Sequence, residues 1–245
     1  MSFKRIFEIP VALLALVILS PVMLLVLLLI WRQDFKNPVY VSRRVGRNQK
    51  MFGMLKFRTM VHNAEKSGVF STSDGDSRIT ALGHFLRRTK IDETPQLVNV
   101  VLGQMSFVGP RANVISEVEF YSTEERRLLS VPPGITDFSS IVFADEGSIL
   151  AGSKDPDEDY RRLIWPGKSA LGLFYVDNGG IVMDSKLILL TLYSLVRRDE
   201  ALQRLSGILE QQNCTPELCQ LVLRRRNLRD EPFLELARAK AGGLQ

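Results

Sequence analysis

The feature that most constrains this chain is a long apolar run close to its N-terminus. From Ile9 to Trp31 there are 23 consecutive residues without a charge, and most of them are Leu, Val or Ile. About 20 such residues are enough for a helix to cross the hydrocarbon core of a bilayer. No small-residue cleavage site follows the run, which is also longer than the apolar part of a secretory signal. We therefore expect a membrane anchor.

Ser20 and Pro21 lie in the middle of this run. A proline inside a helix removes one backbone hydrogen bond and clashes with the preceding turn, so we expect the helix to kink or break there, with about 17 Å in each half. The Ser20 hydroxyl can donate to a carbonyl that the proline leaves free, which makes a break tolerable in lipid. Each half reaches only about halfway through the bilayer core. The sequence thus favours a re-entrant hairpin within residues 1–33, and a kinked spanning helix is the alternative.

Basic residues flank the run on both sides. Lys4 and Arg5 precede it, and residues 32–60 contain eight Lys or Arg against the single acid Asp34. Cytoplasmic flanks are rich in Lys and Arg, so this pattern favours a cytoplasmic position for both ends. A juxtamembrane basic cluster also attracts anionic lipid. The net charge of +5 fits any anionic partner, but the cluster is juxtamembrane and contains no recognition motif for nucleic acid.

The rest of the chain predicts an α+β fold in which helices dominate. Short apolar runs at 38–42 and 51–55 flank a turn at 46–48 and predict a β-hairpin. Polar residues at 63–77 predict a loop, and we expect short helices over 79–86 and over 95–102, where Gly103 ends the second.

Further along, the acidic stretch 144–159 is interpreted as a loop. Asp184 is a candidate N-cap for an apolar helix over 185–196, which is too short to span and is either buried or interfacial. This helix also offers a surface for a homodimer. The tail 198–245 is expected to form solvated helices, and Cys214 and Cys219 are expected to be ordinary thiols.

Candidate chemistry is concentrated around two adjacent carboxylates, Asp92 and Glu93, just ahead of Pro95. Acids at a helix N-terminus can simply cap it. Here, however, Arg87 and Arg88 precede them and a Gly-Pro-Arg turn ending at Arg111 follows. Guanidinium groups neutralise phosphate, while a carboxylate can bind Mg²⁺ or attack phosphorus. Only two histidines are present, which excludes a His-rich metal site, and phosphoryl transfer does not require one.

These residues belong to an ordered series of motifs over about residues 3–197 that resembles the monotopic phosphoglycosyl transferases, which start bacterial glycan assembly on undecaprenyl phosphate. The series comprises Lys4-Arg5-Ile6-Phe7, Ser20-Pro21, Val45-Gly46-Arg47-Asn48, Lys56-Phe57-Arg58-Thr59-Met60, Asp76-Ser77-Arg78-Ile79-Thr80, Leu86-Arg87-Arg88, Asp92-Glu93-Thr94-Pro95-Gln96-Leu97-Val98-Asn99-Val100, Gly103-Gln104-Met105-Ser106-Phe107-Val108-Gly109-Pro110-Arg111, Pro133-Gly134-Ile135-Thr136 and Tyr175-Val176-Asp177-Asn178. No single motif carries the resemblance; the order of all of them does.

The resemblance implies an enzyme at the cytoplasmic face of the bacterial inner membrane, inserted without crossing, with a catalytic domain at 34–197. It implies that Asp92 attacks a nucleotide diphosphate-sugar, with UDP as the expected nucleotide, and that the phosphosugar then passes to polyprenol phosphate. Glu93 would assist, either by placing Mg²⁺ together with Asp92 or by deprotonating the acceptor. The phosphate and nucleotide contacts that it implies are Lys56, Arg58, Arg87 and Arg111.

Some positions depart from the family pattern. Ala112 stands where a second proline is usual, which loosens the turn that carries Arg111, and Glu8, Thr94 and Asp137 replace the more common Asp, Leu and Gly. Two other functions are compatible with the residues. A non-enzymatic adaptor at the membrane surface would tolerate Asp92→Asn, and a nucleotide-sugar hydrolase would not need the lipid acceptor. The sequence does not identify the sugar or the pathway.

Overall fold

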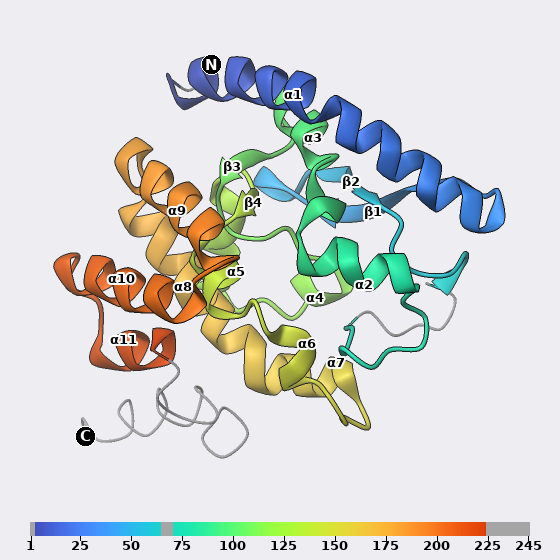
Figure 1. The fold of residues 1–245 in the computed structure, drawn as a ribbon. Helices are drawn as coiled ribbons and strands as arrows, with labels where there is room; N and C mark the ends of the chain where they lie inside the picture. Colours follow the sequence, from blue (N-terminus) through green and yellow to red (C-terminus); the bar gives the residue numbers. More distant parts are fainter. Residues whose placement is uncertain (1–2, 65–70, 224–245) are drawn as a thin grey trace. The chain divides into compact units, whose positions relative to one another are not determined.

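The computed structural model describes residues 3–64 and 71–223. By its internal contacts the chain forms two compact units: residues 1–67 with 77–135, and residues 68–76 with 136–245. Helices dominate, and the described residues contain two sheets of two strands each, which confirms the predicted helix-dominated α+β class (Figure 1). The division into anchor, catalytic domain and tail concerns function and stays a prediction.

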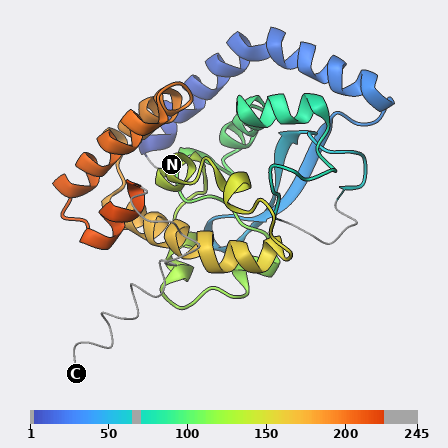
Figure 2. The ribbon, with the colours of Figure 1, turned by 60° about the horizontal axis from the view of Figure 1, so that its bottom comes forward.

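The first helix, α1, runs without interruption from Phe3 to Asp34. The predicted separation into two half-helices at Ser20 and Pro21 is therefore wrong. Pro21 leaves the carbonyl of Val17 without its helical donor, and the Ser20 hydroxyl donates to that oxygen at 2.8 Å, so the helix continues. The helix bends along its length instead (Figure 2). It is long and apolar enough to cross a membrane, and most of its apolar side chains are exposed.

A β-hairpin follows the anchor, as the two short apolar runs predict. Strands β1 (Val39–Val45) and β2 (Met51–Phe57) pair antiparallel, with Val39 opposite Phe57. A short 3-10 turn at Arg47–Gln49 connects them, and Asn48 adopts the left-handed conformation there at φ 55°.

Two short helices carry the chain from the hairpin to the centre of the first unit. Helix α2 (Ala81–Arg88) is capped by the Thr80 hydroxyl, which accepts from the Gly83 amide at 2.9 Å. Helix α3 (Gln96–Val101) ends before Gly103, which has φ +82°. Both helices lie within two residues of their predicted bounds. Part of the predicted loop at 63–77, residues 65–70, lies outside the described residues.

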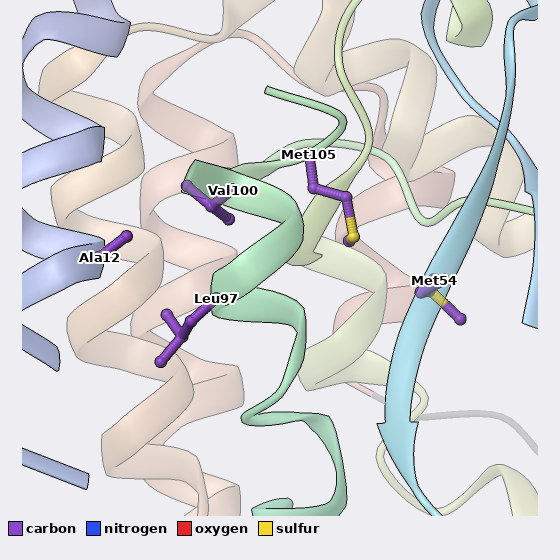
Figure 3. Packing of buried hydrophobic residues seen from close by; sticks show 5 residues of the cluster. All are labelled: Ala12, Met54, Leu97, Val100 and Met105. Carbon is purple, nitrogen blue, oxygen red and sulfur yellow. The ribbon is translucent and has the colours of Figure 1, made fainter. Parts of the chain in front are cut away.

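Helix α3 lies between α1 and β2. Leu97 extends toward Ala12 of α1, while Met54 of β2 and Met105 lie on the other side of α3, and all belong to one buried cluster (Figure 3). The other elements of this unit are β3 (Ser106–Val108), α4 (Ile115–Val118) and a 3-10 helix (Glu125–Ser130). Strand β3 pairs with β4 (Gly134–Thr136).

The second unit is helical. Its elements are α5 (Phe138–Val142), α6 (Glu146–Ile149), α7 (Pro156–Asp159), a π-helical turn (Tyr160–Ile164), α8 (Trp165–Asn178), α9 (Ile181–Ser194), α10 (Arg198–Gln211) and α11 (Pro216–Val222). The acidic stretch 144–159 is thus not only loop, since α6 and α7 form within it.

Two expectations for this unit are wrong. Asp184 does not cap a helix over 185–196, because α9 begins at Ile181 and Asp184 lies inside its first turn, buried and accepting a hydrogen bond from the Tyr175 hydroxyl at 2.7 Å. Cys214 and Cys219 are joined in a disulfide rather than present as free thiols. The predicted tail helices form as far as Val222, with the apolar face of α10 buried, and residues 224–245 lie outside the described residues.

Candidate active site

The two carboxylates lie on one short turn in the first unit. Residues Ile91–Glu93 form a single 3-10 turn that begins after Lys90, which has a left-handed conformation, and leads through Pro95 into α3. Asp92 and Glu93 are both buried, at 7% and 8% exposure. A carboxylate at this depth is costly unless it is paired, so its partners determine what it can do.

Glu93 is held by two cations from distant parts of the chain. Lys56, on β2, donates to Glu93 Oε1 at 3.0 Å, and the Arg111 guanidinium contacts both oxygens of the same carboxylate. Burial by itself raises the pKa of Glu93, but the charges of Arg111 and Lys56 outweigh it and hold that pKa well below its usual range. Burial lowers the pKa of Lys56, and the Glu93 charge opposes that shift.

Asp92 has the opposite environment. Its Oδ1 oxygen is buried and has no hydrogen-bond partner among the described residues. Burial raises the pKa of Asp92, against the attraction of Lys56. The neighbouring carboxylates therefore differ in kind: Glu93 is saturated by cations, while Asp92 keeps an unshared oxygen.

The structure brings together most of the basic residues singled out from the sequence, but not all of them. Lys56 and Arg111 bind Glu93 directly. Arg87 donates from Nε to the Thr59 hydroxyl at 2.9 Å, and its charge is close enough to lower the pKa of Asp92 slightly against burial. Arg58 lies apart: both of its terminal nitrogens bind Asp34, at the end of α1, at 2.7 and 2.5 Å.

Sequence reasoning missed three residues around this site. Thr59 holds Arg87, and Asp34 engages Arg58, although nothing in the local sequence pairs them. Gln96 is fully buried and neither atom of its side-chain amide has a partner among the described residues. A polar side chain directly after Pro95, where an apolar one would bury more easily, was the available signal.

The donor set was compared with what Mg²⁺ requires. Within residues 3–64 and 71–223, no group of three or more His, Cys, Asp or Glu side chains could hold a metal ion by itself. Mg²⁺ bound together with phosphates, however, commonly uses only one or two carboxylates. The unshared oxygen of Asp92 beside Glu93 fits a site of that kind, completed by the phosphates of a substrate.

A long apolar N-terminal helix, a basic hairpin and a buried carboxylate pair beside cations are compatible with a membrane-anchored protein that has an anionic substrate. The sequence model described as bacterial sugar transferase matches residues 1–198. The exopolysaccharide production protein PSS of Rhizobium leguminosarum bv. phaseoli is 38% identical over 203 residues, which cover 80% of this chain and 96% of that protein. The chain belongs to the bacterial sugar transferase family.

Other relatives are longer. The undecaprenyl-phosphate galactose phosphotransferase of Salmonella typhimurium is 34% identical over 81% of this chain, and the UDP-glucose:undecaprenyl-phosphate glucose-1-phosphate transferase of Klebsiella pneumoniae is 33% identical over 79%. The chain spans only 41% and 40% of these two proteins. Family membership makes the chain an enzyme of the sugar transferase class, and the reaction itself is taken up below.

Proposed function

We propose that this protein transfers a sugar-1-phosphate from a nucleotide diphosphate-sugar to polyprenol phosphate through a covalent intermediate on Asp92. The observation that carries the proposal is the contrast within the carboxylate pair. Asp92 is buried with an unshared oxygen, while the adjacent Glu93 fixes two cations next to it. That contrast matches what phosphoryl transfer asks of a protein, a positioned nucleophile and preorganised positive charge.

In the first step an Asp92 oxygen forms a bond to the β-phosphorus of the donor. The bond from that phosphorus to the bridging oxygen breaks, and the nucleoside monophosphate leaves with the bonding electrons. An oxygen without a hydrogen bond attacks more readily, because no donor has to be displaced first. Lys56 and Arg111, aligned by Glu93, lie where they can stabilise charge on the transferring group.

In the second step an oxygen of polyprenol phosphate attacks the same phosphorus and releases the Asp92 carboxylate. A general base should have a pKa near the operating pH, and the pKa of Glu93 is held far below it. Of the two roles expected for Glu93, the charge geometry therefore favours placing cations over deprotonating the acceptor.

Mg²⁺ is the proposed cofactor, at the pair Asp92 and Glu93. Because Arg111 already contacts both Glu93 oxygens, the unshared oxygen of Asp92 would be the direct ligand, together with the donor's phosphates. When bound, the ion neutralises charge on the diphosphate and on the leaving group.

The donor is proposed to be a UDP-sugar and the acceptor undecaprenyl phosphate. The support is the naming of relatives, such as the UDP-glucose:undecaprenyl-phosphate glucose-1-phosphate transferase of Klebsiella pneumoniae.

We also propose that α1 enters and leaves the membrane from the cytoplasmic side. Both of its ends are tied to the same compact unit. Near its start, Arg5 donates to the Val100 carbonyl at 3.1 Å and Glu8 accepts from the Phe107 amide at 3.1 Å, while its last residue, Asp34, binds Arg58. A helix held at both ends by one globular unit cannot place those ends on opposite sides of a bilayer without breaking these contacts.

The test measures UMP release by detergent-solubilised protein with Mg²⁺, undecaprenyl phosphate and a panel of UDP-sugars, beside Asp92→Asn. We expect release that requires both the lipid and Asp92. Release without the lipid would instead indicate hydrolysis, and no difference between wild type and Asp92→Asn would overturn the proposed nucleophile.

A further inference from the structure

Four consecutive residues at the end of β2 each contact a different part of the first unit. Lys56 binds Glu93, and Phe57 packs in a buried cluster with Ile30 of α1. Arg58 binds Asp34, and Thr59 accepts the hydrogen bond from Arg87. This short segment therefore connects the membrane anchor to the site cations.

The contact between Arg58 and Asp34 is the most directional of the four. Two parallel bonds join the guanidinium to the carboxylate, at 2.7 and 2.5 Å, and the Arg58 side chain is only 10% exposed. Paired bonds of this kind fix orientation as well as distance. Asp34 is the last residue of α1, so the pair attaches the exit of the anchor to β2.

Directly beside this pair, the anchor packs on the neighbours of the site residues. One buried cluster joins Val26 and Ile30 of α1 to Phe57 and Leu86, with Ile91 packed against it. In the chain, Phe57 adjoins Lys56, Leu86 adjoins Arg87, and Ile91 adjoins Asp92. A shift of the end of α1 would therefore reach all three site residues through their nearest neighbours.

We propose that the pair formed by Asp34 and Arg58 positions the active site by fixing the end of the anchor against β2. Arg58 is then a positioning residue that acts through Asp34, rather than the phosphate contact expected from the sequence. The inference rests on the proposed transferase function, because its effect is read from the rate of that reaction.

Four variants test it: Arg58→Ala, Asp34→Ala, Asp34→Asn, and the reversed pair Asp34→Arg with Arg58→Asp. Small misplacements of catalytic groups can cost about 100-fold in rate, so we expect each single change to lower kcat by roughly 10- to 100-fold. The KM for the donor should change much less. The reversed pair should recover most of the lost rate, since it restores the ion pair and places a cation at a helix C-terminus, where it is favourable.

If Arg58 instead contacts a phosphate of the donor, the kinetic constants should change in the opposite pattern. Arg58→Ala would then raise the donor KM, both Asp34 variants would keep wild-type kinetics, and the reversed pair would stay inactive because it puts a negative charge beside the substrate. That pattern would overturn the inference. If the reversed pair does not fold, as judged by thermal unfolding, Asp34→Asn distinguishes the two roles of Arg58, because this variant leaves Arg58 in place.

Arg43→Ala is the matched control. It removes one exposed cation from the same hairpin and changes the net charge as Arg58→Ala does. We expect it to retain wild-type kcat and KM. If the wild type is active and the Asp34 variants are equally active, the positioning role is refuted and the proposed function is not. If the wild type releases no UMP with any donor, the result counts against the proposed function itself.

Discussion

At the scale of single residues, Asp92 combines a proposed catalytic role with a cost to stability. Burial raises its pKa above the unfolded value, so the folded state loses stability as the pH rises through the folded pKa. Asp92→Asn removes that loss. We expect it to be inactive yet to melt higher than wild type at pH 8, by roughly 2–4 °C for each 1 kcal/mol relieved. The gain should shrink as the pH falls toward the ordinary pKa of Asp, about 4.

Glu93→Gln should shift stability the other way. The pKa of Glu93 is held low, so its contribution is present above the unfolded pKa and is lost as the pH falls through the folded one. Removing its charge leaves Lys56 and Arg111 without their partner, and partly buried pairs of this kind cost on the order of 1–3 kcal/mol to break. Thermal unfolding at pH 8 and pH 5 measures both variants. Equal changes in melting temperature in the same direction for both variants would contradict the opposite environments described for the two carboxylates.

The sequence was a good guide to some of these residues and not to others. Asp92 and Glu93 stand out locally, because two adjacent acids precede a proline and basic residues lie on either side. The choice of partner does not stand out. Arg58 could bind phosphate or any nearby acid, and only the fold brings it to Asp34, 24 residues earlier in the chain.

At the scale of elements, the close approach of α2 to the segment that follows β2 depends on one glycine. A Cβ built on Gly83 would lie 1.9 Å from the carbonyl oxygen of Thr59, the residue that holds Arg87. Alanine normally stabilises a helix by about 1 kcal/mol relative to glycine. Gly83→Ala should nevertheless destabilise the protein and lower its activity, since backbone has to move.

Gly207 in α10 provides the control. A Cβ there has no atom within 4 Å, so Gly207→Ala should stabilise by about 0.5–1 kcal/mol without changing activity. Thermal unfolding and UMP release measure both variants. If Gly83→Ala proved as stabilising as Gly207→Ala, the contact between α2 and the end of β2 would not be as tight as described.

Element prediction succeeded where the determinants are local. Two short apolar runs and a turn at Gly46 were enough for the hairpin, and Gly103 was enough to end α3. It failed where a side chain compensates for a backbone effect. Pro21 does not break α1, because Ser20 satisfies the carbonyl of Val17, and Asp184 binds the Tyr175 hydroxyl instead of capping α9.

At the scale of the whole molecule, the decisive question is which side of the membrane each end of α1 occupies. With 32 residues and a rise of about 1.5 Å each, the helix is long enough to span the bilayer. The length of α1 therefore does not determine its topology, whereas the contacts of both of its ends with the first unit do. Lys4 donates to the Val108 carbonyl at 2.9 Å and Asp34 binds Arg58, so we expect both ends on the cytoplasmic side.

Single cysteines introduced at Ser2 and at Lys36 test this, in a chain whose Cys214 and Cys219 are changed to serine. A membrane-impermeant thiol reagent should label both positions in inside-out vesicles and neither in right-side-out vesicles. Labelling of position 2 only in right-side-out vesicles, with position 36 labelled only in inside-out ones, would establish a spanning helix and refute the re-entrant anchor.

A chain that also carries Ser20→Ala and Pro21→Ala shows whether the contacts of the N-terminal end or the bend of α1 determines the topology. If the contacts of Lys4, Arg5 and Glu8 hold the N-terminal end, labelling stays as in the parent chain; if the bend alone holds it, position 2 moves to the periplasmic side.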